Sequence, residues 1–325
     1  MSATSRLCAA ALGLCAGLVL SVPMLEVAAR TLGSASLGGT RLAHPESHPL
    51  HPRQGLYMLD GEEGYRPAPS NPDYGPHGAL HNVYALARDG STPRVLCIGD
   101  SVTRRGRIVD ALRKRAPSVE WWNGGVEGWA TRQQAAYVER IGPGIAPDLV
   151  LLLLHLNDFE VTPVNFVDDN GEFVQFRPSA PRKLSAGLYR RSALYRRWIA
   201  WTDRSGDERA LAAELLGALA RMQNEARGRG FELAVAVLPL FAAPGVLPES
   251  VETLAQQRTE VVLAWLDQNG VPGFDLRPAI IAAATAGVAL DQTPGDAQHP
   301  SWPAGDACAA HLIARGLLDL LPARD

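Results

Sequence analysis

Three polar residues in this sequence have the types and spacing that nucleophilic attack on a carbonyl requires. Ser101 directly follows Gly99 and Asp100, at the point where an apolar run ends. A serine hydroxyl is a weak nucleophile until an adjacent base takes its proton. His299 is the candidate base, and Asp296, three residues earlier, can hold the imidazole in one tautomer through a tight turn. These residues predict a Ser-His-Asp triad for acyl transfer.

Three hydrogen-bond donors for the oxyanion of such a reaction follow predicted strands. The backbone N–H of Ser101 stands at the start of a predicted helix, where the positive end of the helix dipole supports it. Gly128 ends a glycine-rich segment, residues 123–128, and offers a second backbone N–H, while Asn157 offers its side-chain amide. An acyl transfer needs such donors where negative charge develops. We therefore expect Ser101, Gly128 and Asn157 to form an oxyanion hole.

The elements that must position these residues alternate between strand and helix from residue 93 onward. Such alternation predicts an α/β domain with a parallel sheet covered on both faces. In such a sheet, ligands bind beyond the carboxyl ends of the strands, where the candidate residues lie. Five strands are predicted at 94–98, 119–123, 148–156, 231–238 and 273–276, with helices at 108–116, 131–141, 207–229, 251–268 and 304–321.

Four short segments of this region together resemble the SGNH (GDSL-type) serine hydrolase superfamily. They read GDSVT at 99–103, NGGVEG at 123–128, Asn-Asp at 157–158 and DAQH at 296–299. Each follows a predicted strand, and the resemblance extends over residues 93–321. The apolar N-terminus and the irregular segment before the first strand resemble the membrane-tethered bacterial members.

The resemblance implies a flavodoxin-like three-layer α/β/α SGNH hydrolase fold with a five-stranded parallel sheet. It implies that Ser101 is the nucleophile, that Asp296 and His299 complete the triad, and that Gly128 and Asn157 complete the oxyanion hole. The activity it implies is that of a serine esterase that forms an acyl-enzyme and requires no metal or organic cofactor. Exported relatives act on O-acetyl groups of carbohydrates or on lipid esters. The absence of a long apolar lid in the sequence favours a small acyl group on a carbohydrate.

Two other functions remain open at this point. One is an O-acyltransferase of the same fold that passes the acyl group to an envelope glycan. The other is a catalytically silent, membrane-held module for envelope assembly.

The sequence departs from the family pattern beside two of the site segments. The family usually carries a glycine just before the Asn-Asp pair, where this chain reads His155-Leu156. A bulky Leu156 is expected to alter the approach of Asn157 to the oxyanion, and His155 is a candidate pocket residue. Arg104 and Arg105, in the first turn after the serine, are candidates for contact with an anionic substrate group.

The N-terminal part of the chain predicts attachment to a membrane. Residues 7–25 form an uncharged run of 19 residues, which is about the length of a membrane-spanning helix. Only Arg6 and the amino terminus carry charge before it, which fits an amino end inside and the remainder exported. The length of the apolar run favours an uncleaved signal anchor. Cleavage near residues 27–29 or 34–36, giving a secreted or periplasmic protein, is the alternative.

We predict three regions: an anchor at 1–30, a stalk and irregular cap at 31–92, and the hydrolase domain at 93–325. The last contains an insert at about 160–205. Within the insert, residues 165–176 predict a hairpin around Asn-Gly. Residues 188–201, LYRRSALYRRWIAW, predict one basic amphipathic helix, which packs its aromatic residues on the domain or lies on a bilayer or an acidic glycan.

Composition excludes several classes of protein. Apolar residues make up 46% of the 325 residues and charged residues 20%, as in a globular protein with a sizeable core. A net charge of −3 argues against a nucleic-acid partner. Two of the four cysteines lie in the apolar run, which leaves Cys97 and Cys308 as expected buried thiols. No metal site is predicted, since prolines interrupt the one histidine cluster, at residues 44, 48 and 51.

Overall fold

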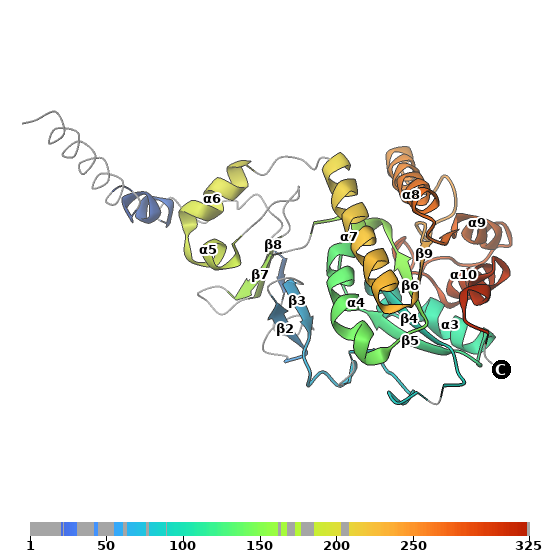
Figure 1. Cartoon of the computed structure of the whole chain (residues 1–325). Helices are drawn as coiled ribbons and strands as arrows, with labels where there is room; N and C mark the ends of the chain where they lie inside the picture. The colour runs from blue at the N-terminus through green and yellow to red at the C-terminus, as the bar shows by residue number, and fades with distance from the viewer. Residues whose placement is uncertain are drawn as a thin grey trace, which may run out of the picture.

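A five-stranded parallel sheet forms the centre of the main body, with the spatial order β10-β9-β6-β4-β5 (Figure 1). Numbered along the chain, these strands stand in the order 2-1-3-4-5, which is the flavodoxin-like arrangement. The predicted fold class is thus confirmed. The strands are β4 (Arg94–Gly99), β5 (Glu120–Gly125), β6 (Leu149–Leu154), β9 (Glu232–Val237) and β10 (Gly273–Asp275).

This computed structural model describes most of the chain. The described residues are 21, 23–30, 42–44, 55–60, 64–75, 78–88, 90–161, 164–167, 173–176, 185–202 and 208–323.

The central strand β6 shows why this sequence builds a parallel sheet. All six residues of its LVLLLL segment are buried, so both of its faces are covered. A continuous apolar run is typical of a strand that packs against helices on both sides. Beyond Leu154 the chain turns into the short helix η2 (Leu156–Phe159), so the strand ends earlier than the predicted residue 156.

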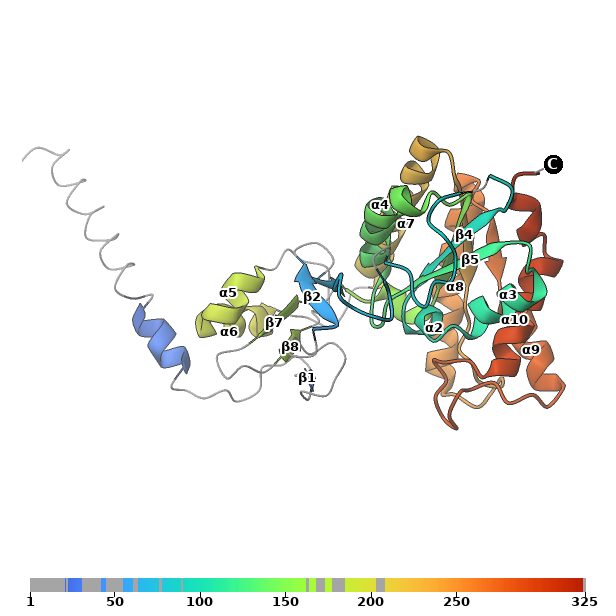
Figure 2. The ribbon, with the colours of Figure 1, turned by 90° about the horizontal axis from the view of Figure 1, so that it is seen from below.

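Helices pack on both faces of the sheet because successive strand residues point to opposite sides. In β4, Leu96 and Ile98 belong to one core cluster, and Val95 and Cys97 belong to the other. Figure 2 shows the layers from a second direction. The first cluster includes residues of α4 (Thr131–Ile145), α7 (Glu208–Arg229) and α8 (Glu249–Asn269), and the second residues of α3 (Arg107–Arg115), α9 (Arg277–Thr285) and α10 (Trp302–Ala314).

Some elements differ from those predicted. Helix α9 was not predicted. The predicted closing helix 304–321 is in fact α10 followed by the separate short helix η3 (Leu317–Leu320), because Gly316 takes a left-handed φ of 88° between them. The chain also forms a one-turn helix α2 (Ser101–Arg104) directly after β4.

Part of the segment before β4 packs on the main body. Strands β2 (Tyr57–Asp60) and β3 (Gly64–Pro67) form an antiparallel hairpin. The side chains of Tyr57, Tyr65 and Tyr74 are buried in the same core cluster as Leu96 and Ile98 of β4. We call the described residues 55–88 the cap.

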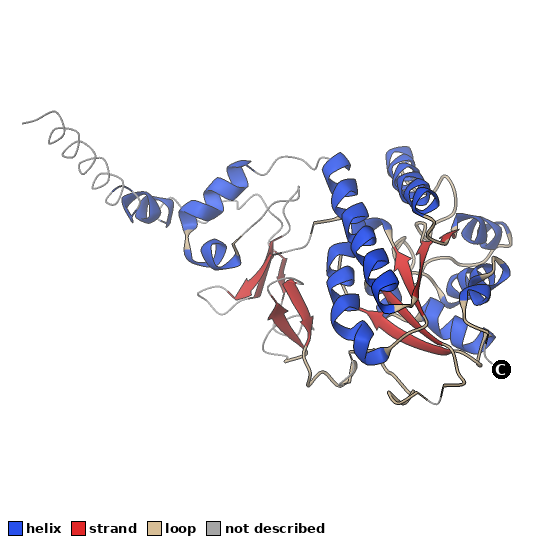
Figure 3. Cartoon of the chain, viewed as in Figure 1, coloured by secondary structure: helices blue, strands red, loops and turns tan. Residues whose placement is uncertain are grey.

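The insert contains the predicted hairpin but not the predicted single helix. Strands β7 (Val164–Val167) and β8 (Phe173–Phe176) pair antiparallel, and β1 (Leu42–His44) from the predicted stalk pairs with β8 (Figure 3). Residues 188–201 form two helices, α5 (Ala186–Arg191) and α6 (Ala193–Thr202). Ser192 separates them because its backbone is extended, with φ −113° and ψ 116°.

The predicted anchor lies largely outside the described residues, which begin at residue 21. Within the described part of the chain, no helix combines the length and apolar character needed to cross a bilayer. Of the histidine cluster, His44 lies in β1, while residues 48 and 51 are outside the described part.

Candidate active site

Ser101 occupies the turn between β4 and the helix α2. Asp100 caps this helix, and its Oδ1 accepts a hydrogen bond of 2.9 Å from the backbone N–H of Val102. A Cβ atom on Gly99 would lie 2.8 Å from the backbone oxygen of Leu153, so only glycine fits at the end of the strand. The GDS sequence thereby places the serine at the carboxyl edge of the sheet with a helix N-terminus behind it.

The three residues of the predicted triad lie in one hydrogen-bonded chain. The Oγ of Ser101 is 2.9 Å from the Nε2 of His299, although 198 positions separate them in sequence. The Nδ1 of His299 is 2.8 Å from the Oδ2 of Asp296. His299 is buried, and its turn is held by a hydrogen bond from the N–H of Gln292 to its backbone oxygen. This geometry suits transfer of the serine proton to the imidazole.

The carboxylate of Asp296 is held in its ionised form. Its partial burial alone would raise the pKa, but the hydrogen bond and charge of His299 lower it. The N–H of Gln298 and the charge of Arg105 lower it further, so the net pKa lies below the ordinary value. An ionised carboxylate on Nδ1 fixes the tautomer that leaves Nε2 able to accept the serine proton.

Gly128 lies in the loop after β5, and a residue of the cap holds this loop. Gly128 takes a φ of +73°, and a Cβ atom there would lie 2.8 Å from the Oη of Tyr65. The hydroxyl of Tyr65 donates to the backbone oxygen of Glu127, and the Nε1 of Trp129 donates to the backbone oxygen of Tyr65 at 3.1 Å. Tyr65 was not predicted as a site residue, because no sequence motif connects it to a loop more than 60 residues away.

A second cap tyrosine contacts the same loop. The hydroxyl of Tyr74 donates to the backbone oxygen of Gly125 at 2.7 Å. Tyr65 and Tyr74 thus hold this loop at Glu127 and Gly125, just before Gly128.

Asn157 lies on η2, and its amide reaches the serine turn through Asp100. Its Nδ2 donates to the Oδ2 of Asp100 at 2.7 Å, and that oxygen is 3.5 Å from the Oγ of Ser101. Leu156, which was expected to alter the approach of Asn157, is buried, and its backbone oxygen accepts a hydrogen bond from Arg258. The bulky residue therefore packs inward and does not separate Asn157 from the serine turn.

His155 is buried directly beside Asn157. Its Nδ1 lies 2.9 Å from the Oδ1 of Asn157, and its ring stacks on Phe241 with 2° between the planes. Because the amide oxygen can only accept, Nδ1 of His155 carries the proton. Within the described part of the chain, its buried Nε2 has no hydrogen-bond partner. The ring therefore supports the amide rather than lining an open pocket.

The two candidate arginines differ in their surroundings. Arg104 lies between two carboxylates, 3.6 Å from Asp73 of the cap and 3.6 Å from Glu127 of the loop. These contacts join the cap to the loop, so the expectation that Arg104 meets an anionic substrate loses its support. Arg105 donates to the Oε1 of Gln292 at 2.9 Å, beside the turn that carries His299.

Asp158, next to Asn157, is a fully buried carboxyl group with no cation beside it among its described contacts. It accepts hydrogen bonds of 2.7 Å from the N–H of His155 and from the Nε2 of Gln134. Burial, followed by the negative charge of Asp100, raises the pKa of Asp158 well above its ordinary value. The raised pKa favours the neutral form, which keeps a second negative charge away from Asp100.

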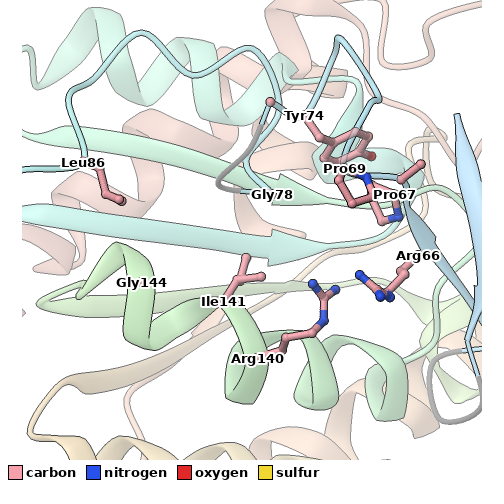
Figure 4. Close-up of a pocket in the computed structure, with 11 residues that line it drawn as sticks. Arg66, Pro67, Pro69, Tyr74, Gly78, Leu86, Arg140, Ile141 and Gly144 are labelled. Carbon is pink, nitrogen blue, oxygen red and sulfur yellow. The ribbon is translucent and has the colours of Figure 1, made fainter.

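A pocket of about 290 Å³ lies between the cap and α4 (Figure 4). Its lining includes Arg66 and Tyr74 of the cap and Arg140 of α4, and the guanidinium groups of the two arginines lie next to each other. None of its lining residues belongs to the predicted triad. Tyr74 therefore faces this pocket while its hydroxyl contacts the loop after β5.

Comparisons with known proteins place the chain near several esterase structures at low similarity. No protein-family model and no curated protein matches it. Similar solved structures include an acetyl xylan esterase, at 13% identity and a TM-score of 0.47 over 68% of this chain and 98% of that chain. A catalytic mutant of an acetylxylan esterase from Geobacillus stearothermophilus has 15% identity and a TM-score of 0.46 over 73% and 100%. A GDSL-like lipase from Bacteroides thetaiotaomicron has 14% identity and a TM-score of 0.44 over 72% and 93%. Similarity at this level assigns no function, so a functional assignment has to rest on the residues of this chain.

Proposed function

We propose that this protein is a serine esterase of the SGNH type. The observation that carries the proposal is the chain of contacts from Ser101 Oγ to His299 Nε2 at 2.9 Å and from His299 Nδ1 to Asp296 Oδ2 at 2.8 Å. A nucleophile, a base and a group that orients the base stand in the order that acyl transfer needs.

The reaction proceeds through an acyl-enzyme. The Oγ of Ser101 attacks the ester carbonyl carbon as His299 takes the serine proton, and a tetrahedral oxyanion forms. The backbone N–H groups of Ser101 and Gly128 and the amide of Asn157 donate to that oxyanion. Its collapse breaks the ester bond, and His299 gives the proton to the departing alcohol. Water, activated by His299, then releases the acid and frees the serine.

The substrate we propose is a small O-acyl group, such as O-acetyl, on a carbohydrate. The resemblance in the four sequence segments suggests this class, and a lipid ester is the second choice. An O-acyltransferase would use the same acyl-enzyme with a sugar hydroxyl in place of water. Measuring acetate release against acetylation of an added glycan separates the two activities.

We further propose that the domain acts outside the cytoplasm, held at a membrane by the N-terminal segment. The uncharged run at residues 7–25 supports this placement. The alternative is a protein released by cleavage of that segment, and the mass of the mature N-terminus distinguishes the two.

The decisive test is the variant Ser101→Ala. It is expected to lose hydrolysis of p-nitrophenyl acetate and labelling by a fluorophosphonate probe, because the only proposed nucleophile is gone. The control Ser118→Ala changes an exposed serine and is expected to keep both. Retained turnover in the Ser101 variant would refute the assignment. A folded wild-type protein that does not react with the probe would instead favour a silent envelope-assembly module.

A further inference from the structure

Large apolar side chains are exposed on two helical segments at one end of the molecule. One segment is residues 23–30, and the other is the pair α5 and α6 of the insert. The exposed fraction reaches 83% for Trp201 and 72% for Met24. We call this set the Trp201 face; it consists of Met24, Leu25, Val27, Leu188, Trp198 and Trp201.

The two segments are fastened to each other, so the Trp201 face belongs to one unit. The carboxylate of Glu26 caps α6, accepting from the backbone N–H groups of Ala193 at 2.7 Å and Leu194 at 3.0 Å. It also accepts a hydrogen bond of 2.7 Å from the hydroxyl of Ser192. Arg30 donates to the backbone oxygen of Arg191 at 2.7 Å. Contacts across more than 160 sequence positions thus hold the N-terminal segment on the insert.

The ionised carboxylate of Glu26 keeps residues 23–30 attached to α6 at neutral pH. Burial alone would raise its pKa, but the hydrogen bonds from Leu194, Ala193, Ser192 and Arg30 together lower it to about 2. Because the pKa is lowered, the stabilisation is present above the ordinary carboxyl pKa and is lost only as the pH falls toward 2.

The Trp201 face is aromatic and aliphatic, and the charged residues of the two insert helices are all arginines. Tyr195, Trp198 and Trp201 follow one another at intervals of three on α6, and the rings of Tyr195 and Trp198 lie 5.6 Å apart. Ile199, between them in sequence, is buried. Residues 185–202 contain four arginines and no acidic residue. Tryptophan with arginine is the composition that gathers at the boundary between lipid headgroups and acyl chains.

The position of the face also points to a membrane. Residues 23–30 and α6 lie at the end of the molecule away from the five-stranded sheet (Figures 1 and 2). Met24 and Leu25, which are exposed on this face, are also the last residues of the uncharged run 7–25. The uncharged run, which is about the length of a membrane-spanning helix, therefore ends at the Trp201 face.

We propose that the Trp201 face rests on the surface of a lipid bilayer that contains anionic headgroups. Trp198, Trp201 and the aliphatic side chains enter the interfacial region, and the exposed Arg191 and Arg197 meet the headgroup phosphates. The face thereby sets the distance and orientation of the catalytic body relative to the membrane. The proposal concerns a surface remote from Ser101 and does not depend on the esterase function.

Tryptophan quenching by brominated lipid tests the proposal. The full chain is incorporated into vesicles of phosphatidylethanolamine and phosphatidylglycerol, with and without brominated phosphatidylcholine. Bromine quenches only tryptophans that contact the acyl region, so the wild type is expected to lose emission. The double variant W198F/W201F is expected to lose about half or more of that quenching, because interfacial tryptophans lie within reach of the label.

A matched control uses another exposed tryptophan. Trp302 lies half-exposed on α10 of the main body, and W302F is expected to show the same lipid quenching as the wild type. Circular dichroism and hydrolysis of a soluble ester should be unchanged in W198F/W201F. Equal quenching in W198F/W201F and the wild type would overturn the proposal. So would crosslinking that shows the face covered by a second protein copy in the vesicles.

Discussion

The Nδ1 of His155 lies 2.9 Å from the Oδ1 of Asn157, while the Nδ2 of the same amide donates to Asp100 at 2.7 Å. The hydrogen bond from the imidazole thus fixes the orientation of the amide, with Nδ2 directed toward the serine turn. His155 does not touch the reacting atoms in this arrangement. We therefore propose that it is a positioning residue that acts through Asn157.

His155→Phe is expected to lower kcat for p-nitrophenyl acetate by about tenfold with little change in KM. Phenylalanine keeps a ring against Phe241 but cannot donate to Asn157, so the amide loses its fixed orientation. Asn157→Ala removes the proposed oxyanion donor itself, so it is expected to cause the larger loss, on the order of 10²–10³ in kcat. Steady-state kinetics and melting temperatures of both variants check this. A large loss of stability in His155→Phe with kcat unchanged would show a packing role only.

Tyr65→Phe is expected to reduce kcat several-fold, because the loop that carries Gly128 loses the hydrogen bond from the Tyr65 hydroxyl to Glu127. The cost in stability should be about 1 kcal/mol, as for one hydrogen bond. Tyr57→Phe is the matched control, since its hydroxyl contacts Tyr74 at 3.5 Å and the structure shows it no bond to this loop. If both variants lower kcat equally, the effect belongs to the cap in general and the specific role of Tyr65 is refuted.

Asp158→Asn is expected to make stability less dependent on pH. Because burial and the charge of Asp100 raise the pKa of Asp158, its protonated form favours folding at low pH. This contribution is lost as the pH rises through the raised folded-state pKa. Wild-type protein should therefore lose stability relative to Asp158→Asn as the pH rises above the ordinary carboxyl range, because the unfolded chain ionises this group more readily than the folded one. Urea unfolding at several pH values measures the difference, and parallel curves for the two proteins would contradict it.

Cys97 and Cys308 are expected to resist alkylation in the folded protein. Both are buried free thiols, and burial raises the pKa of each to about 12. Since the thiolate is the reactive form, iodoacetamide should label neither residue near neutral pH until urea is added. Peptide mapping by mass spectrometry separates them from Cys8 and Cys15. Labelling of either buried thiol in the native protein at the rate of a free thiol would contradict the structure.

The sequence by itself determined the features that depend on neighbouring residues. The apolar run of β6, the GDS turn after β4 and the Asp296-x-x-His299 turn are local patterns. Each forms within the predicted residues, although β6 ends at Leu154 and not at residue 156. Their order along the chain was enough to expect the triad at one edge of the sheet, because parallel strands bring their carboxyl ends together.

Only the tertiary structure decided which distant segments complete these features. Tyr65 contacts the loop of Gly128, β1 pairs with β8, and Glu26 caps α6 across 166 positions or more. The helical periodicity of 188–201 continues through Ser192, yet the chain breaks there because its hydroxyl and the carboxylate of Glu26 serve as caps. A single hydrogen bond between segments far apart leaves no periodic signal in the sequence. Such contacts depend on how distant segments pack against each other and not on local pattern.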